Sequence, residues 1–266
     1  MTTGVLIFAF NNEHIDYLAM ANWSAQNIRR HLRLPVAVVT DRTVPAHYRF
    51  EQIVPAVATG NHTRNFDDLP ESVTWYNGNR VDAYNLSPWA ETLVLDADYV
   101  VATDQLKIIV NCNQDFLAHK TAYDVCGDPS FNEHNTFGQY HMPMWWATVM
   151  WFRRSQQAQL IFETMQMIRD NWDHYKALYN MGRTVYRNDF ALSIALGTVN
   201  GHTLDHAYIP WNLATVTHNQ KLTQLDQDRY RVDFVAPDGK PKWIQLAQDF
   251  HAMGKGQLGA IIDSAG

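Results

Sequence analysis

The segment over residues 93–101 constrains the fold of this chain more than any other. Its apolar first part is typical of a strand that is buried in a sheet. Two carboxylates then follow one residue apart, Asp96 and Asp98. Side chains two residues apart on an extended chain project to the same face. We therefore expect the two carboxylates to converge at the carboxyl end of a buried strand.

Two carboxylates that are held close together need a positive counter-ion. A hard divalent cation prefers oxygen ligands, and a cation held by only two carboxylates keeps open positions for the phosphates of a substrate. The pattern thus predicts a binding site for a metal and a nucleotide-diphosphate donor. The same Asp-x-Asp spacing also occurs where carboxylates only cap the next element, so the tripeptide alone leaves both interpretations open.

Polar residues also follow two strands predicted near the N-terminus. A strand over residues 4–10 ends at Phe10 and Asn11, a helix follows over 14–31, and a strand over 36–40 ends at Asp41. Such an order predicts a right-handed βαβ unit, in which ligands bind beyond the carboxyl ends of the strands. We expect Phe10, Asn11 and Asp41 to contribute to donor binding, while Asn11 and Asp41 could also serve only as caps.

The remaining pattern predicts an α/β chain that forms one domain. Residues 44–78 have weak periodicity and are predicted to be mostly irregular, and residues 79–86 are predicted to form a short helix. Strands are expected over 121–126 and 147–152, helices over 155–172 and 189–196, an extended segment over 207–215, and a hairpin over 230–247. The long connection over 130–146 is typical of a functional loop.

Composition limits the possible partners and location. The formal net charge is -6, which provides no overall attraction to nucleic acid or to an anionic membrane. The one basic cluster, Arg29, Arg30, His31 and Arg33, falls near the end of a predicted helix, where cations complement the helix dipole. The two cysteines fit a cytoplasmic protein with reduced thiols. The apolar N-terminal run is too short for a membrane span.

Residues 80–86 (RVDAYNL) and 93–98 (LVLDAD) together resemble the donor-binding stretch of glycogenin-like, GT-A-fold glycosyltransferases. In that family a basic residue opens a short helix, and Asp-Ala-Asp closes the next strand at the same spacing. The resemblance implies a Rossmann-like α/β fold with a mixed central sheet flanked by helices. It implies that Asp96 and Asp98 hold Mn²⁺ or Mg²⁺, and that Arg80 and Asp96 contact a nucleotide-sugar donor, a UDP-sugar. Residues 1–102 would form the nucleotide-sugar-binding half.

A second resemblance to this family lies near the C-terminus. The family's His-x-x-Gly-x-x-Lys motif is matched in shortened form by His251-Ala252-Met253-Gly254-Lys255. The resemblance implies that His251 completes the metal site and that Gly254 and Lys255 contact the diphosphate. An imidazole ligand favours Mn²⁺ over Mg²⁺. Residues 103–266 would then form the acceptor-binding half and carry this metal-ligand segment.

The candidate catalytic residues are Asn188 and Asp189, which stand where the family has an Asp-Gln pair before a helix. Asp189 would orient the donor sugar or the acceptor hydroxyl. The resemblance implies retention of the anomeric configuration, whereas an inverting enzyme would need a general base that Asp189 could equally supply. Residues 145–148 replace the family's Asn-x-Gly strand, which contacts the donor sugar, so the sugar is not identified.

The acceptor is suggested by a further resemblance. Residues 88–92 and 187–189 are similar to phage-encoded glycosyltransferases, some of which glycosylate hydroxymethylated pyrimidines in viral DNA. This implies modified DNA as acceptor and the host cytoplasm as location. We expect aromatic and histidine side chains of the 130–146 loop to stack on a planar acceptor: His134, Tyr140, His141, Trp145 and Trp146. The alternatives are a glycan, protein or small-molecule acceptor, another nucleotide-sugar enzyme, or a noncatalytic binding module.

Overall fold

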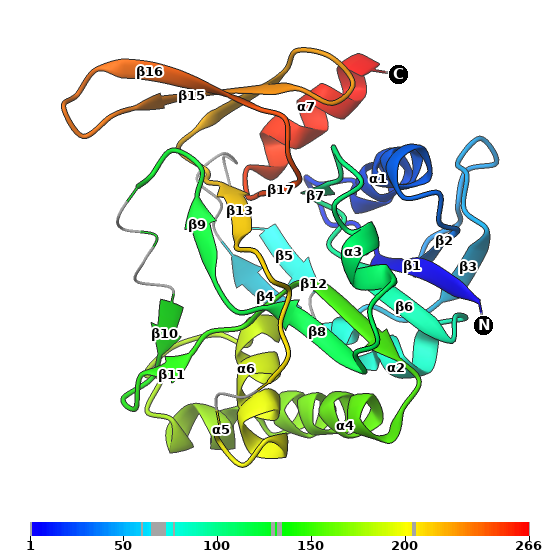
Figure 1. The fold of residues 1–266 in the computed structure, drawn as a ribbon, viewed down its shortest axis with the longest axis vertical. Coiled ribbons are helices and arrows are strands. Elements are labelled where there is room, and N and C mark those ends of the chain that lie inside the picture. Colours follow the sequence, from blue (N-terminus) through cyan, green and yellow to red (C-terminus); the bar gives the residue numbers. More distant parts are fainter. Residues whose placement is uncertain are drawn as a thin grey trace.

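The computed structural model describes residues 2–59, 61–64, 73–76, 78–128, 131, 135–203 and 206–265. Within these ranges the chain builds a mixed central sheet of six strands in the order β3-β2-β1-β6-β12-β8 (Figure 1). The strands are β1 (Thr3–Phe8), β2 (Val36–Thr40), β3 (Gln52–Pro55), β6 (Glu91–Leu95), β8 (Phe116–His119) and β12 (Trp146–Arg153). The first four in the sheet order are parallel, and β12 runs antiparallel to both of its neighbours. The predicted α/β class with a mixed sheet flanked by helices is confirmed.

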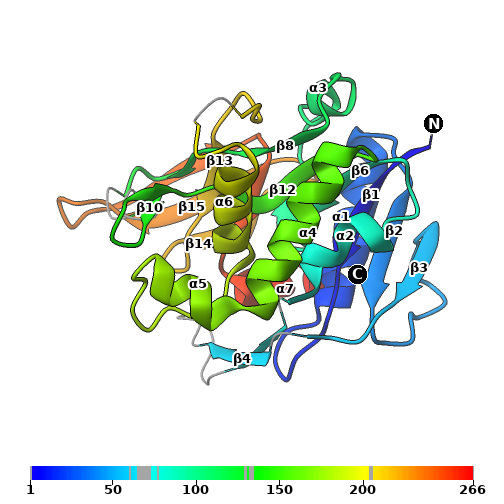
Figure 2. The same ribbon diagram turned by 90° about the horizontal axis from the view of Figure 1, so that it is seen from below.

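Helices cover both faces of this sheet. Helix α1 (Tyr17–His31) lies on one face, and α4 (Gln156–Asp170) and α6 (Asn188–Val199) lie on the other (Figures 1 and 2). The Asp16 and Ser155 side chains cap α1 and α4 by accepting backbone N–H groups. The shorter helices are η1 (Gly78–Asp82), α2 (Ala83–Leu86), α3 (Lys107–Val110), α5 (Trp172–Leu178) and α7 (Lys255–Ala265).

A second sheet joins the C-terminal part of the chain to the segment after β6. Its order is β7-β17-β13-β9, formed by β7 (Tyr99–Val100), β17 (Phe250–Ala252), β13 (Leu213–Val216) and β9 (Ala122–Asp124). Strand β17 runs antiparallel to β7, with His251 paired to Tyr99. This pairing places the C-terminal His-containing segment directly beside the Asp-x-Asp segment.

The remaining strands form small peripheral sheets. The sheet of β14 (Lys221–Gln224), β15 (Tyr230–Val235) and β16 (Pro241–Leu246) includes the predicted hairpin, which projects from the body in Figure 1. Two short antiparallel pairs are β4 (Asn61–Arg64) with β5 (Val73–Tyr76), and β10 (Thr136–Phe137) with β11 (Met142–Pro143).

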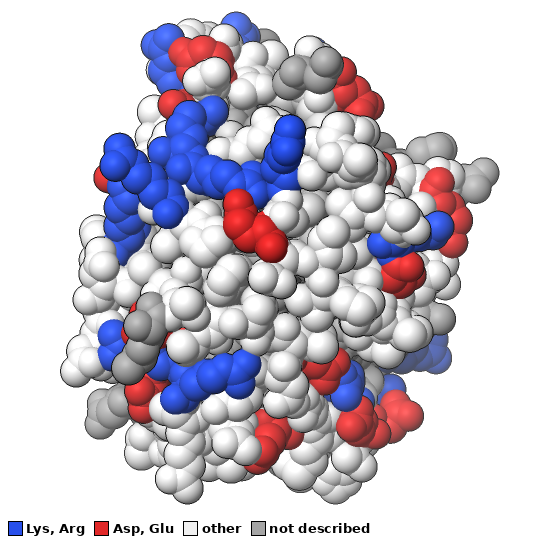
Figure 3. Space-filling model, turned by 90° about the vertical axis from the view of Figure 1, so that its right-hand side faces the viewer, with Lys and Arg blue, Asp and Glu red and all other residues white. Residues whose placement is uncertain are grey.

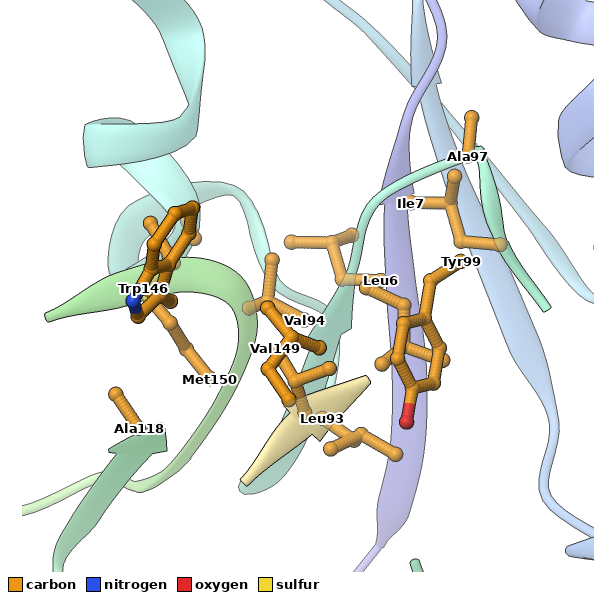
Figure 4. Packing of buried hydrophobic residues seen from close by; sticks show 14 of the residues in the cluster. Leu6, Ile7, Leu93, Val94, Ala97, Tyr99, Ala118, Trp146, Val149 and Met150 are labelled. Carbon is orange, nitrogen blue, oxygen red and sulfur yellow. The ribbon is translucent and has the colours of Figure 1, made fainter. Parts of the chain in front are cut away.

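The core lies around the central strands, which explains their apolar sequences. Leu6, Leu93, Val94 and Val149 come from β1, β6 and β12 and lie together in Figure 4, each without exposed surface. Because both faces of these strands are covered, almost every position is apolar rather than every second one. The apolar run after residue 92 was therefore a sound signal for a central strand.

Gly4 in β1 tests how closely this core is packed. A Cβ atom at residue 4 would lie 2.4 Å from Cε2 of Trp89, whose indole N–H donates to the Val5 carbonyl at 3.2 Å. Gly4→Ala is expected to lower the free energy of unfolding by about 1–3 kcal/mol because the buried indole must shift. Gly259→Ala is the control: its nearest neighbour is 4.0 Å away and helix α7 gains about 0.5–1 kcal/mol. Urea unfolding measures both, and equal changes would contradict this packing.

One local prediction is incomplete and another is wrong. Residues 44–78 contain the short strands β3, β4 and β5, which were not predicted, between segments without regular structure. Strand β3 lies at the sheet edge, where it pairs with β2, and three of its four residues are exposed, so burial imposes no apolar pattern on it. Asp96 and Asp98 also do not continue an extended strand. Strand β6 ends at Leu95, and the Tyr99 N–H donates to the Asp96 carbonyl at 3.0 Å, so a tight turn carries both carboxylates.

Candidate active site

A pocket opens beside the carboxyl ends of β1 and β6, where the sequence places its candidate ligands. It encloses about 980 Å³, part of which is open to solvent. The side chains that line it come from the N-terminal and the C-terminal half of the chain, from Phe8 at the end of β1 to Lys255 at the start of α7. Eight of the predicted site residues are among them: Phe10, Arg80, Asp96, Asp98, Asn188, Asp189, His251 and Lys255.

Asp96, Asp98 and His251 form a group that could hold a metal ion. One ligand atom from each lies within 4.8 Å of the others, and His251 Nε2 is 3.4 Å from Asp98 Oδ2. The turn after β6 brings the two carboxylates together, and the pairing of β17 with β7 brings the imidazole. Metal–ligand bonds of about 2.1 Å require ligand atoms roughly 3–4 Å apart, so small side-chain shifts suffice. Two carboxylate oxygens and one imidazole nitrogen suit a divalent cation.

Two cations contact these carboxylates directly. An Arg80 guanidinium nitrogen pairs with Asp96 Oδ1, and Lys255 Nζ pairs with Asp98 Oδ2. Arg80 also donates to the Ala147 carbonyl at 3.3 Å, and Lys255 donates to the Ala252 carbonyl at 3.2 Å. Burial lowers the pKa of Arg80, which Asp189 partly opposes. The pocket thus holds charged groups of both signs in mutual contact.

Asp189 lies at the start of α6 and is held by several donors. Its carboxylate accepts the Ala147 N–H at 2.9 Å and two Arg187 guanidinium N–H groups at 3.2 and 2.6 Å. Burial alone would raise the pKa of this carboxyl, but the Arg187 charge and the Ala147 hydrogen bond together lower it below 3.8. Asp189 is therefore ionised at neutral pH and a weak proton acceptor. Asn188 beside it is buried and accepts a hydrogen bond from the Tyr186 hydroxyl at 3.1 Å.

Three predicted donor-binding residues do not line the pocket. The Asn11 side chain accepts the Leu18 N–H at 2.9 Å and donates to Asp16, so it supports the start of α1. Asp41 follows β2 and lies 3.8 Å from the Arg42 guanidinium. Gly254 is buried immediately before Lys255. Their contribution to donor binding stays a prediction.

Other pocket residues escaped the sequence reasoning. They are Tyr17, Trp75, Tyr76, Asn79, Arg187 and His218, together with Thr148 of β12 and three apolar residues, Phe8, Ala97 and Met253. Trp75 and Tyr76 lie on β5, a strand of only four residues within the range that was predicted to be mostly irregular. The one usable signal was Arg187, because it directly precedes the candidate pair of catalytic residues.

The 130–146 loop is packed more than expected. Trp145 is buried edge-on against His206, with ring centroids 5.6 Å apart, so the expectation that it stacks on an acceptor is wrong. Trp146 lines the pocket, but Phe131 stacks on its ring at 5.7 Å. Tyr140 is 64% exposed and His141 is also exposed. His134 lies outside the described residues.

The predicted basic cluster lies at the C-terminal end of α1, as the helix-dipole interpretation requires. Arg29 pairs with Glu51 at 3.0 Å, and Arg30 and His31 both contact Asp228, at 2.5 and 2.8 Å. No member of the cluster lines the pocket. Figure 3 shows one face on which Lys and Arg side chains gather in a band with acidic side chains beside them. Three members of the cluster, Arg29, Arg30 and His31, are thus engaged by acidic neighbours.

Comparisons with known proteins gave matches only among solved structures. No protein-family model and no curated protein matches the chain. The galactosyltransferase LgtC with donor and acceptor sugar analogues has a TM-score of 0.46 and 10% identity, over 73% of this chain and 69% of that one. Mouse xyloside xylosyltransferase 1 has a TM-score of 0.44 and 11% identity, over 79% and 84%. The glycosyltransferase GlyE of Streptococcus pneumoniae TIGR4 has 0.43 and 11%, over 79% and 46%.

These structures are glycosyltransferases, but identities of 10–11% and TM-scores below 0.5 do not assign an activity to this chain. Among the described residues, no helix combines the length and apolar character that crossing a membrane requires.

Proposed function

We propose that this chain is a metal-dependent glycosyltransferase that moves a sugar from a nucleoside-diphosphate sugar, a UDP-sugar, to an acceptor hydroxyl. The observation that carries the proposal is the convergence of Asp96, Asp98 and His251 with Arg80 and Lys255 in one pocket. Carboxylates and an imidazole suit a divalent cation, and the two basic side chains suit phosphates. This combination is the chemistry that a nucleotide-sugar donor requires.

The remaining lining of the pocket suits a nucleoside. Tyr17 of α1 and Trp75 and Tyr76 of β5 contribute flat aromatic faces on which a nucleobase could stack. In this proposal residues 1–102 supply the donor-binding half, and residues 103–266 supply the acceptor-binding half and the C-terminal ligand segment.

Transfer requires the diphosphate to leave with its negative charge stabilised. Asp96, Asp98 and His251 would hold Mn²⁺, or Mg²⁺, which supplies Lewis-acid stabilisation of the leaving group when bound. Arg80 and Lys255 would donate hydrogen bonds to the phosphate oxygens of this leaving group. Arg187 is a further cation in the pocket, and its ion pair with Asp189 fixes its position.

The ionised state of Asp189, which makes it a weak base, favours retention of the anomeric configuration. A general base in an inverting enzyme must take a proton from the acceptor hydroxyl, and its efficiency falls as its pKa falls. The pKa of Asp189 is lowered, and both carboxylate oxygens accept hydrogen bonds. We therefore propose that the leaving phosphate takes the acceptor proton, and that Asp189 and Asn188 orient groups around the reacting carbon.

For the acceptor we retain a hydroxymethylated pyrimidine of phage DNA, with the host cytoplasm as location. The exposed Tyr140 side chain offers a stacking face for an extruded base. One observation favours the alternative, a glycan, protein or small-molecule hydroxyl. The cluster formed by Arg29, Arg30 and His31 lies outside the pocket and is engaged by acidic neighbours.

An assay with a panel of nucleotide sugars tests both the proposed transfer reaction and the proposed acceptor. The protein is incubated with Mn²⁺ and each sugar, with hydroxymethylated duplex DNA, with the same duplex unmodified, or with neither. We expect released nucleoside diphosphate that depends on Mn²⁺, and a mass gain on the modified duplex only. Donor cleavage without any gain on DNA would move the acceptor to another hydroxyl. Nucleotide binding without metal-dependent cleavage would make the chain a noncatalytic binding module.

A further inference from the structure

The carboxylates of the proposed metal site are already neutralised by side chains of the same pocket. Lys255 Nζ contacts Asp98 Oδ2, the same oxygen that lies 3.4 Å from His251 Nε2. Arg80 contacts Asp96 Oδ1 in the same way. The Lys255 and Asp98 side chains are only 10% and 7% exposed, so solvent screens their attraction weakly. The ammonium group therefore lies among the ligand atoms that a metal ion would use.

The charges of the pocket balance without any metal. Among its described lining residues, three are basic, Arg80, Arg187 and Lys255, and three are Asp residues. A divalent cation bound alone would therefore leave an excess of positive charge in a partly buried cleft. A diphosphate bound alone would leave an excess of negative charge. Both bound together restore the balance, because each phosphate of a nucleotide sugar carries a negative charge.

We propose that Arg80 and Lys255 are exchangeable counter-ions, which hold Asp96 and Asp98 in the empty pocket and pass to the donor's phosphates when metal and donor bind together. This inference rests on the proposed function and extends it to the order of binding. The lysine side chain has the length and flexibility for such a move, since its four-carbon stem carries three rotatable donors. No bond is made or broken in the exchange; only ion pairs change partners.

The exchange has a thermodynamic consequence. Metal binding alone must displace two cations that stay trapped beside the metal, so the affinity of the donor-free protein for Mn²⁺ should be low. A nucleoside diphosphate accepts the displaced cations and thereby raises the affinity for Mn²⁺. By linkage, Mn²⁺ must raise the affinity for the nucleoside diphosphate by the same factor. The two basic residues would thus prevent the pocket from trapping a metal ion without donor.

Lys255→Met tests the proposal because it removes the charge and keeps most of the apolar stem. Binding of Mn²⁺ alone, of UDP alone and of UDP with saturating Mn²⁺ is measured by isothermal titration calorimetry on the full chain. We expect the donor-free variant to bind Mn²⁺ about tenfold more tightly than the unaltered protein, and to bind UDP with Mn²⁺ more weakly. The factor by which Mn²⁺ raises the affinity for UDP should be smaller in the variant, by on the order of 10 to 100-fold.

Two further variants make the result specific. Lys255→Arg keeps a cation and should keep the low Mn²⁺ affinity. Lys107→Met removes the same charge from an exposed pair with Asp104 and should leave all three titrations unchanged. Thermal melting checks that each variant is folded. A purely structural Lys255 would give weaker binding of both ligands when replaced, or no change, and either result would overturn the exchange.

The outcome for the unaltered protein separates the two proposals. If it binds neither Mn²⁺ nor UDP, the proposed function fails and the exchange fails with it. If it binds both with strong coupling and Lys255→Met leaves that coupling intact, only the exchange is wrong.

Discussion

Asp98→Asn is expected to lower the rate of sugar transfer by at least about 100-fold while the fold is retained. Asp98 is buried, and its Oδ2 atom faces both His251 and Lys255. An amide keeps the size of the side chain but removes the negative charge that a divalent cation needs. Because loss of even an outer partner of a metal ligand costs about 10 to 100-fold, loss of a ligand should cost more. Transfer is measured at saturating Mn²⁺, alongside thermal melting.

The same assay ranks the members of the site. His251→Ala removes the one imidazole ligand and should reduce transfer by about 10 to 100-fold, with partial recovery at higher Mn²⁺ concentration. Asp104→Asn is the matched control, because Asp104 is largely exposed, pairs with Lys107 and does not line the pocket. Near-normal transfer by Asp98→Asn at saturating Mn²⁺ would remove the Asp-x-Asp segment from the metal site.

Asp189→Ala is expected to reduce both stability and transfer. The change leaves the Arg187 guanidinium and the Ala147 N–H without their carboxylate partner in a partly buried position. Breaking such a pair on one side costs about 3 kcal/mol of unfolding free energy. Transfer should fall because Arg187 loses the contact that positions it in the pocket. Urea unfolding and donor cleavage measure the two effects.

Asp189→Asn separates charge from shape through its pH dependence. The native-state pKa of Asp189 lies below the usual 3.8, so its charge stabilises the fold at higher pH. That contribution is complete above the unfolded value and is lost as the pH falls through the lowered native value. The stability deficit of Asp189→Asn should therefore be largest near about pH 7 and shrink towards about pH 3. An equal loss of stability at the two pH values would show that the charge of Asp189 is not the cause.

The central part of the fold was predictable because burial on both faces imposes a simple pattern. The strands β1, β2, β6 and β12 are apolar at nearly every position, and each was located from that pattern. The edge strand β3 was missed because its side chains are mostly exposed, so burial does not restrict their type. A backbone pairing with β2 forms β3, and such pairings leave little trace in the sequence.

The 130–146 loop shows that functional residues are also hard to predict from sequence alone. Trp145 and Trp146 are residue types expected in a stacking surface. In the structure Trp145 is buried in the core, and Phe131 stacks on the ring of Trp146. A sequence does not distinguish a ring that packs from a ring that recognises, because both are apolar and large.

The sequence by itself determined the chemistry of the candidate site: two carboxylates after a buried strand, a histidine near the C-terminus, and basic residues at family-like positions. Only the tertiary structure decided that these groups meet, because the pairing of β17 with β7 joins segments far apart along the chain. It also decided that a turn, rather than an extended strand, brings Asp96 and Asp98 together. Their ion pairs with Arg80 and Lys255 could not be predicted, since through-space charge contacts depend on distances that sequence spacing does not fix.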